Sequence, residues 1–466
     1  MITVSNTIAI TNPPAELLEY CKQYLVLKNP EYAKKVRMHH WLGNTPQHLY
    51  LYEWRGDALV LPYGTLRKVL EICTKVGISA SDIKMDFPTP ERIDYGCKLP
   101  LYDYQQEAVE HVYWGQCGIL QSPAGSGKTQ MAIELIVRHG KRALFLTHTR
   151  DLLLQSKDRA KQYMGEALLG TITEGKVNIG KGITFATVQT MCNLDLAQYK
   201  DMWDVIIVDE CHRAAGTPTA VSQFSKVLNS LAARHKYGLS ATVHRSDGLI
   251  KATFALLGDV IYTVPTEAVA DKIMKVGICP VPTGIGISRG CQNPDGTLNY
   301  AKLIGYLAES DERNVRIIDC IVENRENPSL ILSDRLGHLE TLMSMLPADM
   351  REDAVMVSGK MTTKKGKAER EQAIADMRTG EKRYLFATYS LAKEGLDVPR
   401  LERLYMATPQ KDYAVITQAI GRIARTSKGK AEPVVYDFVD DIQYLVKAYK
   451  KRCTTYRKNG CYFVER

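Results

Sequence analysis

The feature that most constrains the fold is a short glycine-containing loop between an apolar run and a helix. Residues 122–129 read Ser-Pro-Ala-Gly-Ser-Gly-Lys-Thr and follow the apolar run 117–120. A phosphate-binding loop has the pattern Gly-x-x-x-x-Gly-Lys-Ser/Thr. Here Ser122 replaces the first glycine, and the last three residues match. Because residues 130–137 continue as an expected helix, the segment predicts a strand, a loop and a helix whose N-terminus holds phosphate.

Each residue type in this loop has a role toward a bound phosphate. Gly125 and Gly127 let backbone N–H groups approach phosphate oxygens, where a Cβ would obstruct them. Lys128 can reach the β- and γ-phosphates, and the Thr129 hydroxyl can ligate Mg²⁺. ATP with Mg²⁺ is therefore the expected ligand. The expected ATP-binding residues of the loop are Ser122, Pro123, Ala124, Gly125, Ser126, Gly127, Lys128 and Thr129.

A second apolar run ends in two carboxylates. Residues 203–208 read Trp-Asp-Val-Ile-Ile-Val and are followed by Asp209 and Glu210. In a phosphate-loop enzyme the first acid after such a strand holds Mg²⁺, and a neighbouring carboxylate can orient and deprotonate the attacking water. We therefore assign Asp209, with Thr129, to the metal and Glu210 to the water. A polar strand end without a catalytic role is the alternative.

Length, composition and charge narrow the class of protein. The chain has 466 residues, more than one ordinary domain, with 45% hydrophobic and 24% charged residues. We find no signal-peptide pattern at the N-terminus and no run as long as a membrane span. The 11 cysteines include no Cys-x-x-Cys pair, so neither zinc nor disulfides are indicated, and a reducing cytoplasm is expected. The net charge of +9 suits a polyanionic partner.

Two series of short apolar runs predict two successive doubly wound α/β lobes with parallel sheets. Residues 1–95 differ and predict a small α+β accessory domain that contacts DNA, and residues 266–315 read as a connection with a loop-rich insertion. The predicted domains are 1–95, 96–265, 266–440 and a basic helical tail, 441–466. The predicted strands are 117–120, 143–147, 183–187 and 205–208 in the first lobe, and 330–333, 354–357, 383–387, 403–407 and 434–437 in the second.

The motifs, taken in order, resemble those of superfamily 2 helicases. Asp209-Glu-Cys-His is similar to the Asp-Glu-x-His box, and Leu239-Ser-Ala-Thr resembles motif III. Residues 386–399 resemble motif V, and residues 418–425 resemble motif VI. The match spans residues 100–440, and the motif sequences are similar to those of phage and repair helicases of the UvsW, XPB and RecG kind. The resemblance implies two RecA-like lobes and a motor that uses ATP on branched or damaged DNA.

Two arginines of motif VI complete the expected catalytic set. Arg422 and Arg425, which we expect at the start of a helix, would stabilise charge on the γ-phosphoryl group of ATP from the second lobe. Arginine fingers of this kind raise the rate by about 10³–10⁵. Gln418 belongs to the same motif. A surface ion pair is the alternative role for Arg422.

Further roles are implied by the resemblance alone. Gln105 would hydrogen-bond adenine, although a tyrosine stands at position 102, where the family often has arginine. Gly395 and Asp397 would face the nucleotide or its ribose. Lobe coupling would involve His212, Ser240 and Thr242.

Polar residues at strand ends are expected to hold a nucleic-acid backbone without reading its sequence. Residues 147–150 resemble motif Ia, and residues 187–190 resemble the next nucleic-acid-contacting motif. Residues of the second lobe occupy similar positions at strand ends. For any one of these residues, a capping or solvent-exposed role is the alternative. The expected contacts are Thr149, Arg150, Thr187, Gln189, Ser333, Arg335, Gly359 and Thr388.

Three basic segments lie outside the motifs: residues 34–41, 360–367 and 441–466. The last holds seven Lys or Arg and two acidic residues, with aromatic side chains between them. Cations with aromatics suit single strands or junctions, because charge binds the backbone and rings stack on bases. For the tail, a helix docked by its tyrosines and solvated by its lysines is the alternative.

These observations lead to one main functional hypothesis and two alternatives. The main one is an ATP-dependent DNA helicase or translocase that remodels forked or branched DNA, acting as a monomer in a bacterial or phage-infected cytoplasm. An RNA helicase is the first alternative, and Asp-Glu-Cys-His in place of Asp-Glu-Ala-Asp weighs against it. The second is an ATP-gated nucleic-acid clamp that does not unwind, for which nucleic acid would not stimulate turnover.

Overall fold

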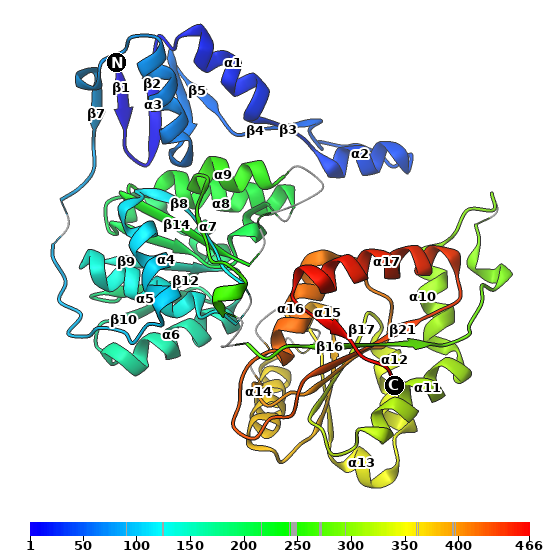
Figure 1. Cartoon of the computed structure of the whole chain (residues 1–466). Coiled ribbons are helices and arrows are strands. Elements are labelled where there is room, and N and C mark those ends of the chain that lie inside the picture. Colours follow the sequence, from blue (N-terminus) through cyan, green and yellow to red (C-terminus); the bar gives the residue numbers. More distant parts are fainter. Residues whose placement is uncertain are drawn as a thin grey trace. The chain divides into compact units, whose positions relative to one another are not determined.

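The computed structural model places the chain in two compact units (Figure 1). It describes all residues except 90, 124, 216, 242, 244–248, 270–272, 294, 360, 362, 394, 395 and 397. The first unit comprises Met1–Pro123 and Gly127–Pro265, and Thr266–Arg466 forms the bulk of the second. Among the described residues, no helix is long and apolar enough to cross a membrane.

The N-terminal part of the first unit is a small sheet with helices. Helices α1 (Ala15–Tyr24) and α3 (Leu66–Lys75) pack on it. Strands β3 (Val26–Lys28) and β4 (His48–Tyr50) form a separate two-stranded sheet, from which Leu27 and Leu49 pack on the same core, and α2 (Pro30–Arg37) extends beyond it (Figure 1). Helix α2 has no buried residue, and Trp41 beyond it is 89% exposed. The strand order is β5 (Glu53–Arg55), β6 (Ala58–Pro62), β2 (Thr7–Thr11), β1 (Ile2–Val4) and β7 (Ile83–Met85).

This N-terminal sheet shares its hydrophobic core with the α/β lobe that follows it. Ala252 and Ala255, from a helix of that lobe, belong to the same buried cluster as the N-terminal strands. The backbones approach so closely that a Cβ on Gly64 would lie 2.4 Å from the amide nitrogen of Gly258. The Tyr63 hydroxyl donates to Arg234 O at 2.8 Å. These contacts hold the two parts of the first unit together.

The first α/β lobe is built on an eight-stranded sheet. Helices α4 (Asp103–Trp114), α5 (Lys128–His139) and α6 (Arg150–Met164) pack side by side, as do α7 (Val188–Cys192), α8 (Pro218–Ser230) and α9 (Ile250–Leu257). All neighbours except β10 and β11 pair in parallel. The order is β11 (Lys176–Asn178), β10 (Leu169–Thr173), β12 (Ile183–Thr187), β9 (Ala143–Thr147), β13 (Val205–Val208), β14 (His235–Ser240), β8 (Cys117–Gln121) and β15 (Val260–Thr263).

The second unit is built on a seven-stranded, all-parallel sheet. One face carries α11 (Asp311–Glu323), α12 (Leu336–Met345) and α13 (Ala348–Glu352); the other carries α14 (Lys364–Thr379), α15 (Tyr389–Lys393), α16 (Tyr413–Ile423) and α17 (Gln443–Lys458). A further helix, α10 (Tyr300–Glu309), has its own small cluster with Ile442 and Leu445. The order is β18 (Ala354–Val357), β19 (Tyr384–Thr388), β17 (Ser329–Ser333), β20 (Arg403–Met406), β21 (Val434–Val439), β16 (Gly277–Pro282) and β22 (Tyr462–Phe463).

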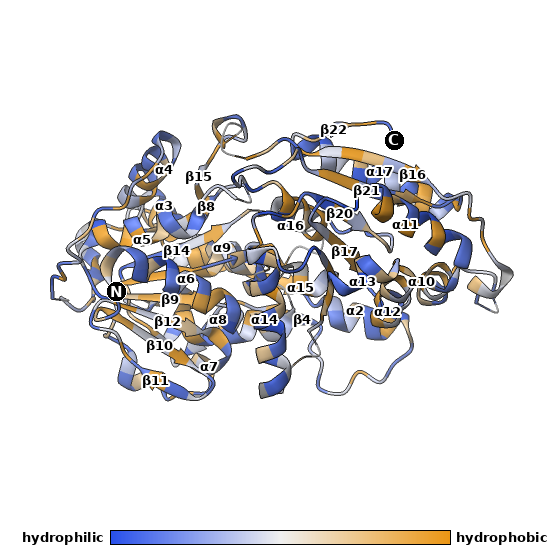
Figure 2. Cartoon of the chain, turned by 90° about the horizontal axis from the view of Figure 1, so that it is seen from below, coloured by the Kyte–Doolittle hydropathy of each residue, from blue (hydrophilic) through white to orange (hydrophobic). Residues whose placement is uncertain are grey.

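Both lobes are α/β domains built on mainly parallel sheets, as the apolar runs predict. Strands β9, β12 and β13 are buried along their whole length, because helices cover both faces of the sheet. Figure 2 shows β9, β10 and β12 coloured mainly as hydrophobic. The runs predicted at 143–147, 183–187, 205–208 and 354–357 coincide with strands of the structure, and the other five overlap them with ends shifted by one or two residues.

The prediction for residues 266–315 is wrong in part, because this segment contributes β16, the strand next to the edge strand β22, to the second sheet. Strand β16 reads Gly-Ile-Cys-Pro-Val-Pro, and proline is unusual inside a sheet because it cannot donate to the ladder. Its neighbour β22 pairs only with Gly277 and Ile278. Pro280 and Pro282 lie beyond the two residues of β16 that pair with β22. Their missing N–H groups therefore remove no hydrogen bond between β16 and β22.

The C-terminal segment is integrated into the second unit and is not a separate tail. Strand β22 joins the sheet, and α17 docks with Tyr456 fully buried and Arg452 1% exposed. Arg452 Nε and Nη2 donate to the two carboxylate oxygens of Asp437 at 2.8 and 2.9 Å, and Tyr456 donates to Asp437 at 2.7 Å. The arrangement matches the docked-helix alternative for this segment.

We expect Arg452→Ala to destabilise the second unit strongly. The substitution leaves the carboxylate of Asp437 buried without its cation, which costs about 3–5 kcal/mol in comparable pairs. Lys451→Ala is the matched control, because Lys451 is exposed on the same helix and such changes stay within about 0.5 kcal/mol. Urea unfolding of both variants measures the difference; equal midpoints would show that the buried pair contributes little.

Candidate nucleotide and nucleic-acid sites

The phosphate loop joins β8 to α5 and has the backbone that its glycines allow. Gly125 has φ 82° and Gly127 has φ 80°, both in the left-handed region that favours glycine. Lys128 begins α5, and its Nζ donates to Ser122 O and Pro123 O, each at 3.2 Å. Two carbonyls thus hold the ammonium over the loop.

Gln105 lies directly against this loop. A Cβ on Gly127 would be 2.4 Å from Gln105 Nε2, so a larger residue there would displace the Gln105 side chain. The side chain is 2% exposed, and its Oε1 accepts from Tyr102 N at 3.0 Å, which fixes it at the first turn of α4. The structure therefore brings the predicted adenine-contacting residue next to the phosphate loop.

Asp209 and Glu210 follow β13 at the same edge of the sheet. Asp209 is 7% exposed, and Glu210 N donates to its Oδ1 at 2.9 Å. Glu210 has φ 47°, a left-handed conformation that is uncommon for a residue other than glycine and clusters at functional sites. Burial, with the neighbouring Glu210, raises the pKa of Asp209 above its usual range, and Lys128 opposes the shift. The buried carboxylate of Asp209 fits a divalent cation, with Thr129 in the first turn of α5 as a further ligand.

His212 connects Glu210 to the end of the neighbouring strand β14. Its Nδ1 lies 3.3 Å from Glu210 Oε2 and 3.0 Å from Ser240 Oγ. Ser122 N donates to Ser240 O at 2.9 Å, which links the same strand end to the phosphate loop. These contacts join the predicted water-activating and coupling residues; the coupling role itself stays a prediction.

Motif VI lies on α16 of the second unit, and one expectation about it is wrong. Arg422 lies in the last turn of the helix and Arg425 just beyond it, not at its start. The helix begins after Asp412, whose side chain accepts from Val415 N, and the C-terminal turn is the favourable end for a cation. Gln418 is 9% exposed, and its Oε1 has no hydrogen-bond partner within the described residues.

The expected nucleic-acid residues of the first lobe lie on neighbouring strands. β9 and β12 pair in register up to Thr147 and Thr187, so Thr149, Arg150 and Gln189 follow the same edge. Thr149 caps α6, Arg150 pairs with Glu174 at 3.5 Å, and Thr187 donates to Thr190 at 2.9 Å. Gln189 Nε2 lies 3.2 Å from His148 Nδ1, a residue that the sequence did not single out.

In the second unit, the candidates follow β17, β18 and β19, which are neighbours in the sheet. Arg335 and Gly359 are exposed, and Thr388 lies 2.9 Å from the Ser390 hydroxyl through its Oγ1. Ser333 is fully buried; its hydroxyl accepts from Arg335 N and contacts His338. Ser333 therefore orders the backbone that presents Arg335 and does not reach the surface itself. The candidates Ala124, Thr242, Gly395 and Asp397 lie outside the described residues.

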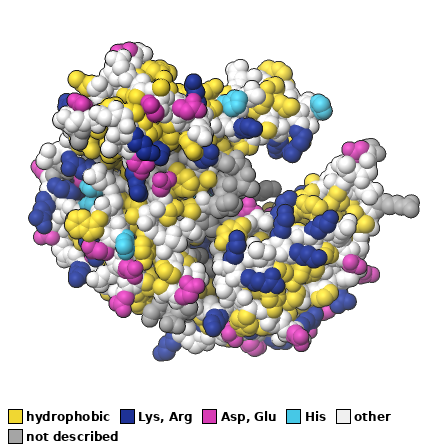
Figure 3. Space-filling model, turned by 45° about the horizontal axis from the view of Figure 1, so that its top comes forward, with side chains coloured by type: hydrophobic (Ala, Val, Ile, Leu, Met, Phe, Trp, Pro, Cys, Tyr) yellow, Lys and Arg dark blue, Asp and Glu magenta, His cyan; other side chains and the backbone are white. Residues whose placement is uncertain are grey.

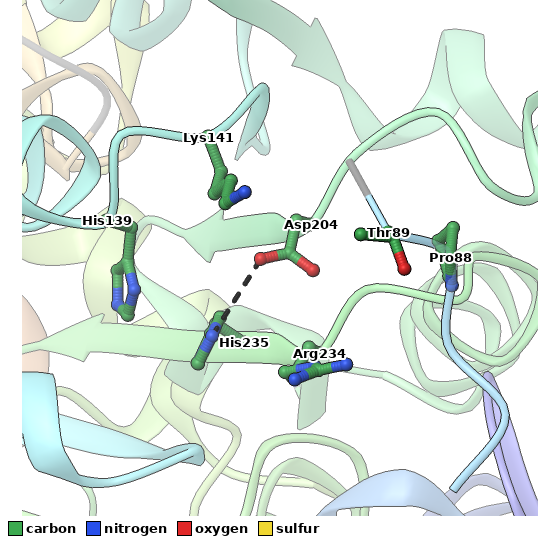
Figure 4. Close-up of a pocket in the computed structure, with 7 residues that line it drawn as sticks. All are labelled: Pro88, Thr89, His139, Lys141, Asp204, Arg234 and His235. Atoms are coloured by element: carbon green, nitrogen blue, oxygen red, sulfur yellow. Dashed lines mark ion pairs between the residues drawn. The ribbon is translucent and has the colours of Figure 1, made fainter. Parts of the chain in front are cut away.

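A polar pocket of about 190 Å³ lies at the opposite edge of the first lobe (Figure 4). Asp204 and His235 stand at the amino ends of β13 and β14, whereas the nucleotide residues follow the carboxyl ends. Ligands of open parallel sheets bind at the carboxyl ends. Burial lowers the pKa of His235 to about 3 and that of His139 to about 4, so both rings are neutral near pH 7. The lining residues are Pro88, Thr89, His139, Lys141, Asp204, Arg234 and His235.

Known proteins share these features. The family "Type III restriction enzyme, res subunit" matches residues 98–245, and "Helicase conserved C-terminal domain" matches residues 312–427. "Putative ATP-dependent RNA helicase L396" of Acanthamoeba polyphaga mimivirus is 27% identical over 350 residues, 74% of this chain and 64% of that protein. "DNA 3'-5' translocase XPB2" of Sulfurisphaera tokodaii is 25% identical over 371 residues, 72% of this chain and 80% of that protein. The chain thus spans less than two thirds of the mimivirus relative.

A solved structure shares the fold. S. cerevisiae Dbp5 bound to RNA and ADP BeF3 superposes with a TM-score of 0.53 at 18% identity, covering 78% of this chain and 90% of that one. A phosphate loop and two carboxylates on a parallel sheet define the first lobe as the core of a P-loop nucleoside triphosphatase. With its second RecA-like lobe, the chain belongs to the superfamily 2 helicases, a family of ATP-hydrolysing enzymes.

Proposed function

We propose that this protein is an ATP-dependent DNA translocase or helicase that remodels forked or branched DNA. The observation that carries the proposal is the division of catalytic groups between two units. Lys128, Asp209 and Glu210 belong to the first unit, and Arg422 and Arg425 belong to the second. If both sets act on one ATP, hydrolysis requires the lobes to come together, and each turnover then drives a closing and opening movement.

The residues of the first unit have defined roles in this proposal. Lys128 exchanges the carbonyls of Ser122 and Pro123 for phosphate oxygens. Glu210, placed beside His212, orients the attacking water and accepts its proton. Asp209 and Thr129 hold Mg²⁺, which when bound neutralises charge on the phosphates. The proposed role of the arginines is to stabilise the charge that develops on the γ-phosphoryl group.

The choice of DNA as the substrate rests on the motif sequence Asp-Glu-Cys-His and on relatives such as the translocase XPB2. The mimivirus relative carries an RNA helicase name, so RNA is the competing substrate. The exposed α2 and Trp41 of the N-terminal part would contact the branch, since aromatic side chains can stack on unpaired bases. A monomer is the form we propose.

Stimulation of ATP hydrolysis by different nucleic acids tests the proposal. We expect single-stranded and forked DNA to raise turnover well above the rate without nucleic acid, and RNA to raise it less. All substrates must be compared at one salt concentration, because backbone binding depends steeply on salt. Stronger stimulation by RNA would assign an RNA helicase. Nucleotide-dependent binding without stimulated turnover would assign a clamp.

A further inference from the structure

The exposed face of α17 carries cations and no acid. Residues 443–458 contain no Asp or Glu. Leu445, Arg452 and Tyr456 dock one side of the helix, so the opposite side faces solvent. Within the described part of the chain, Arg452 and Arg466 form the ion pairs of the C-terminal segment 441–466. The charged residues of the exposed side, here called the α17 basic face, are Lys447, Lys450, Lys451, Arg457 and Lys458.

Figure 3 shows this concentration of charge. On the visible face of the second unit, Lys and Arg side chains gather centrally, and most acidic side chains lie toward the margin. A helix of 16 residues is about 24 Å long, the length of about seven nucleotides at the spacing of one strand of B-form DNA. The face is therefore long enough to follow several phosphates of one strand.

Exposed aromatic rings accompany the cations. Tyr444 is 38% exposed, Tyr413 is 37% exposed and Phe463 is 41% exposed. Large rings left this accessible beside cations are the combination that single-strand-binding surfaces use, since rings stack on bases and cations bind phosphates. The cations over these rings are Lys411, 5.7 Å from the centre of Tyr444; Lys458, 6.0 Å from Tyr413; and Arg457, 5.8 Å from Phe463.

The basic face is continuous with the strand ends of the second sheet. Lys411 Nζ donates to the Tyr444 hydroxyl at 3.0 Å and lies 5.5 Å from the ring centre of Tyr300. Ala301, which follows Tyr300 in the chain, accepts a hydrogen bond at its carbonyl from Arg335 Nη2 at 3.0 Å. Arg335 follows β17, where the sequence predicts a nucleic-acid contact. A chain of direct contacts therefore leads from that predicted contact to the start of α17.

We propose that Tyr444 and the α17 basic face form a binding surface for single-stranded DNA that continues from the strand ends of the second sheet. The proposal rests on the proposed DNA-motor function and adds the path of the strand beyond the motifs. Single-stranded DNA fits because its bases are open to stacking while its phosphates are charged. An acidic protein would engage the cations without needing the rings, and a duplex keeps its bases inside.

Point variants test the surface, since deleting the C-terminal segment would remove the buried Arg452–Asp437 pair. Lys447→Ala/Lys451→Ala removes two cations one turn apart, and Tyr444→Ala removes the ring. Tyr444→Phe keeps the ring and loses only the hydroxyl. The matched control is Arg316→Ala/Lys428→Ala, two exposed cations elsewhere in the second unit. Binding of labelled oligothymidine and of a DNA duplex is measured at several salt concentrations, with melting temperatures to confirm folding.

The expected results are specific to the surface. Tyr444→Ala weakens oligothymidine binding by about 5- to 150-fold, the range for loss of one stacked base, and Tyr444→Phe binds like the wild type. The double lysine variant lowers the slope of log K against log salt by about 1.4, because each phosphate contact on a single strand contributes about 0.7. The control pair changes neither quantity.

The outcomes separate this proposal from the proposed function. If the wild type is stimulated by DNA while the α17 variants bind oligothymidine as the wild type does, the surface proposal fails alone. Weakened duplex binding with unchanged oligothymidine binding also overturns it. If no nucleic acid stimulates the wild type, the motor proposal fails, and the binding data still decide whether α17 contacts a single strand.

Discussion

Arg422→Ala is expected to lower the ATP turnover number by about 10³–10⁵-fold while changing the affinity for ATP much less. An arginine finger interacts with charge that develops in the transition state, so its loss appears in kcat and not in the ground-state complex. Arg422 occupies the last turn of α16, and Arg425 lies just past it. The ammonium of Lys430 donates to the carbonyls of Ile423 and Arg425, which holds this helix end in place.

Steady-state kinetics at saturating DNA measure the effect. Arg425→Ala is compared in parallel, and the arginine with the larger loss in kcat is the finger. Arg316→Ala, an exposed arginine on α11, controls for a general loss of charge. An unchanged kcat for both Arg422→Ala and Arg425→Ala would remove the finger role from this motif.

Lys128→Ala is expected to abolish measurable ATP hydrolysis and to leave DNA binding largely intact. Without the ammonium, the loop lacks the cation that reaches the β- and γ-phosphates. Among the described residues, the Lys128 side chain hydrogen-bonds the carbonyls of Ser122 and Pro123 at 3.2 Å, so its loss should disturb the fold little. Hydrolysis and oligothymidine binding are measured on the same preparation.

Two further variants are compared with Lys128→Ala. Lys176→Ala removes an exposed lysine on β11 of the same lobe and should hydrolyse ATP normally. Glu210→Gln should retain ATP binding and lower hydrolysis by about 10²–10⁴-fold, the usual contribution of general acid–base catalysis. Near-normal turnover of Lys128→Ala would overturn the assignment of the phosphate loop.

The sequence predicted those strands whose signal is local. Residues of β9, β12 and β13 are apolar or threonine and buried throughout, because both faces of a parallel sheet are covered, and a run of this kind is visible without the fold. β14 was missed because its second residue is Lys236. In the structure this ammonium is fully buried and donates to Leu228 O at 2.7 Å and to Asn6 O at 3.3 Å. Its acceptors include a residue 230 positions away, which no local pattern contains.

The candidate functional residues likewise include some that a local motif predicts and others that only the fold brings together. The phosphate loop and the pair Asp209–Glu210 are short contiguous motifs, so their residue types and spacing predict them without the fold. The group formed by Tyr300, Lys411 and Tyr444 draws on three segments that only the fold brings together. The position of the motif VI arginines in the helix was missed because the helix start depends on the Asp412 cap, six residues before the motif begins at Gln418.

The packing of the N-terminal sheet on the first lobe has a mechanical consequence. Gly64 lies against Gly258, Tyr63 bonds to Arg234 and Lys236 bonds to Asn6, so this sheet cannot turn without turning the lobe. Helix α2 projects from that rigid assembly with no buried residue of its own. A rotation of the ATP-binding lobe would therefore carry α2 and the exposed Trp41 with it.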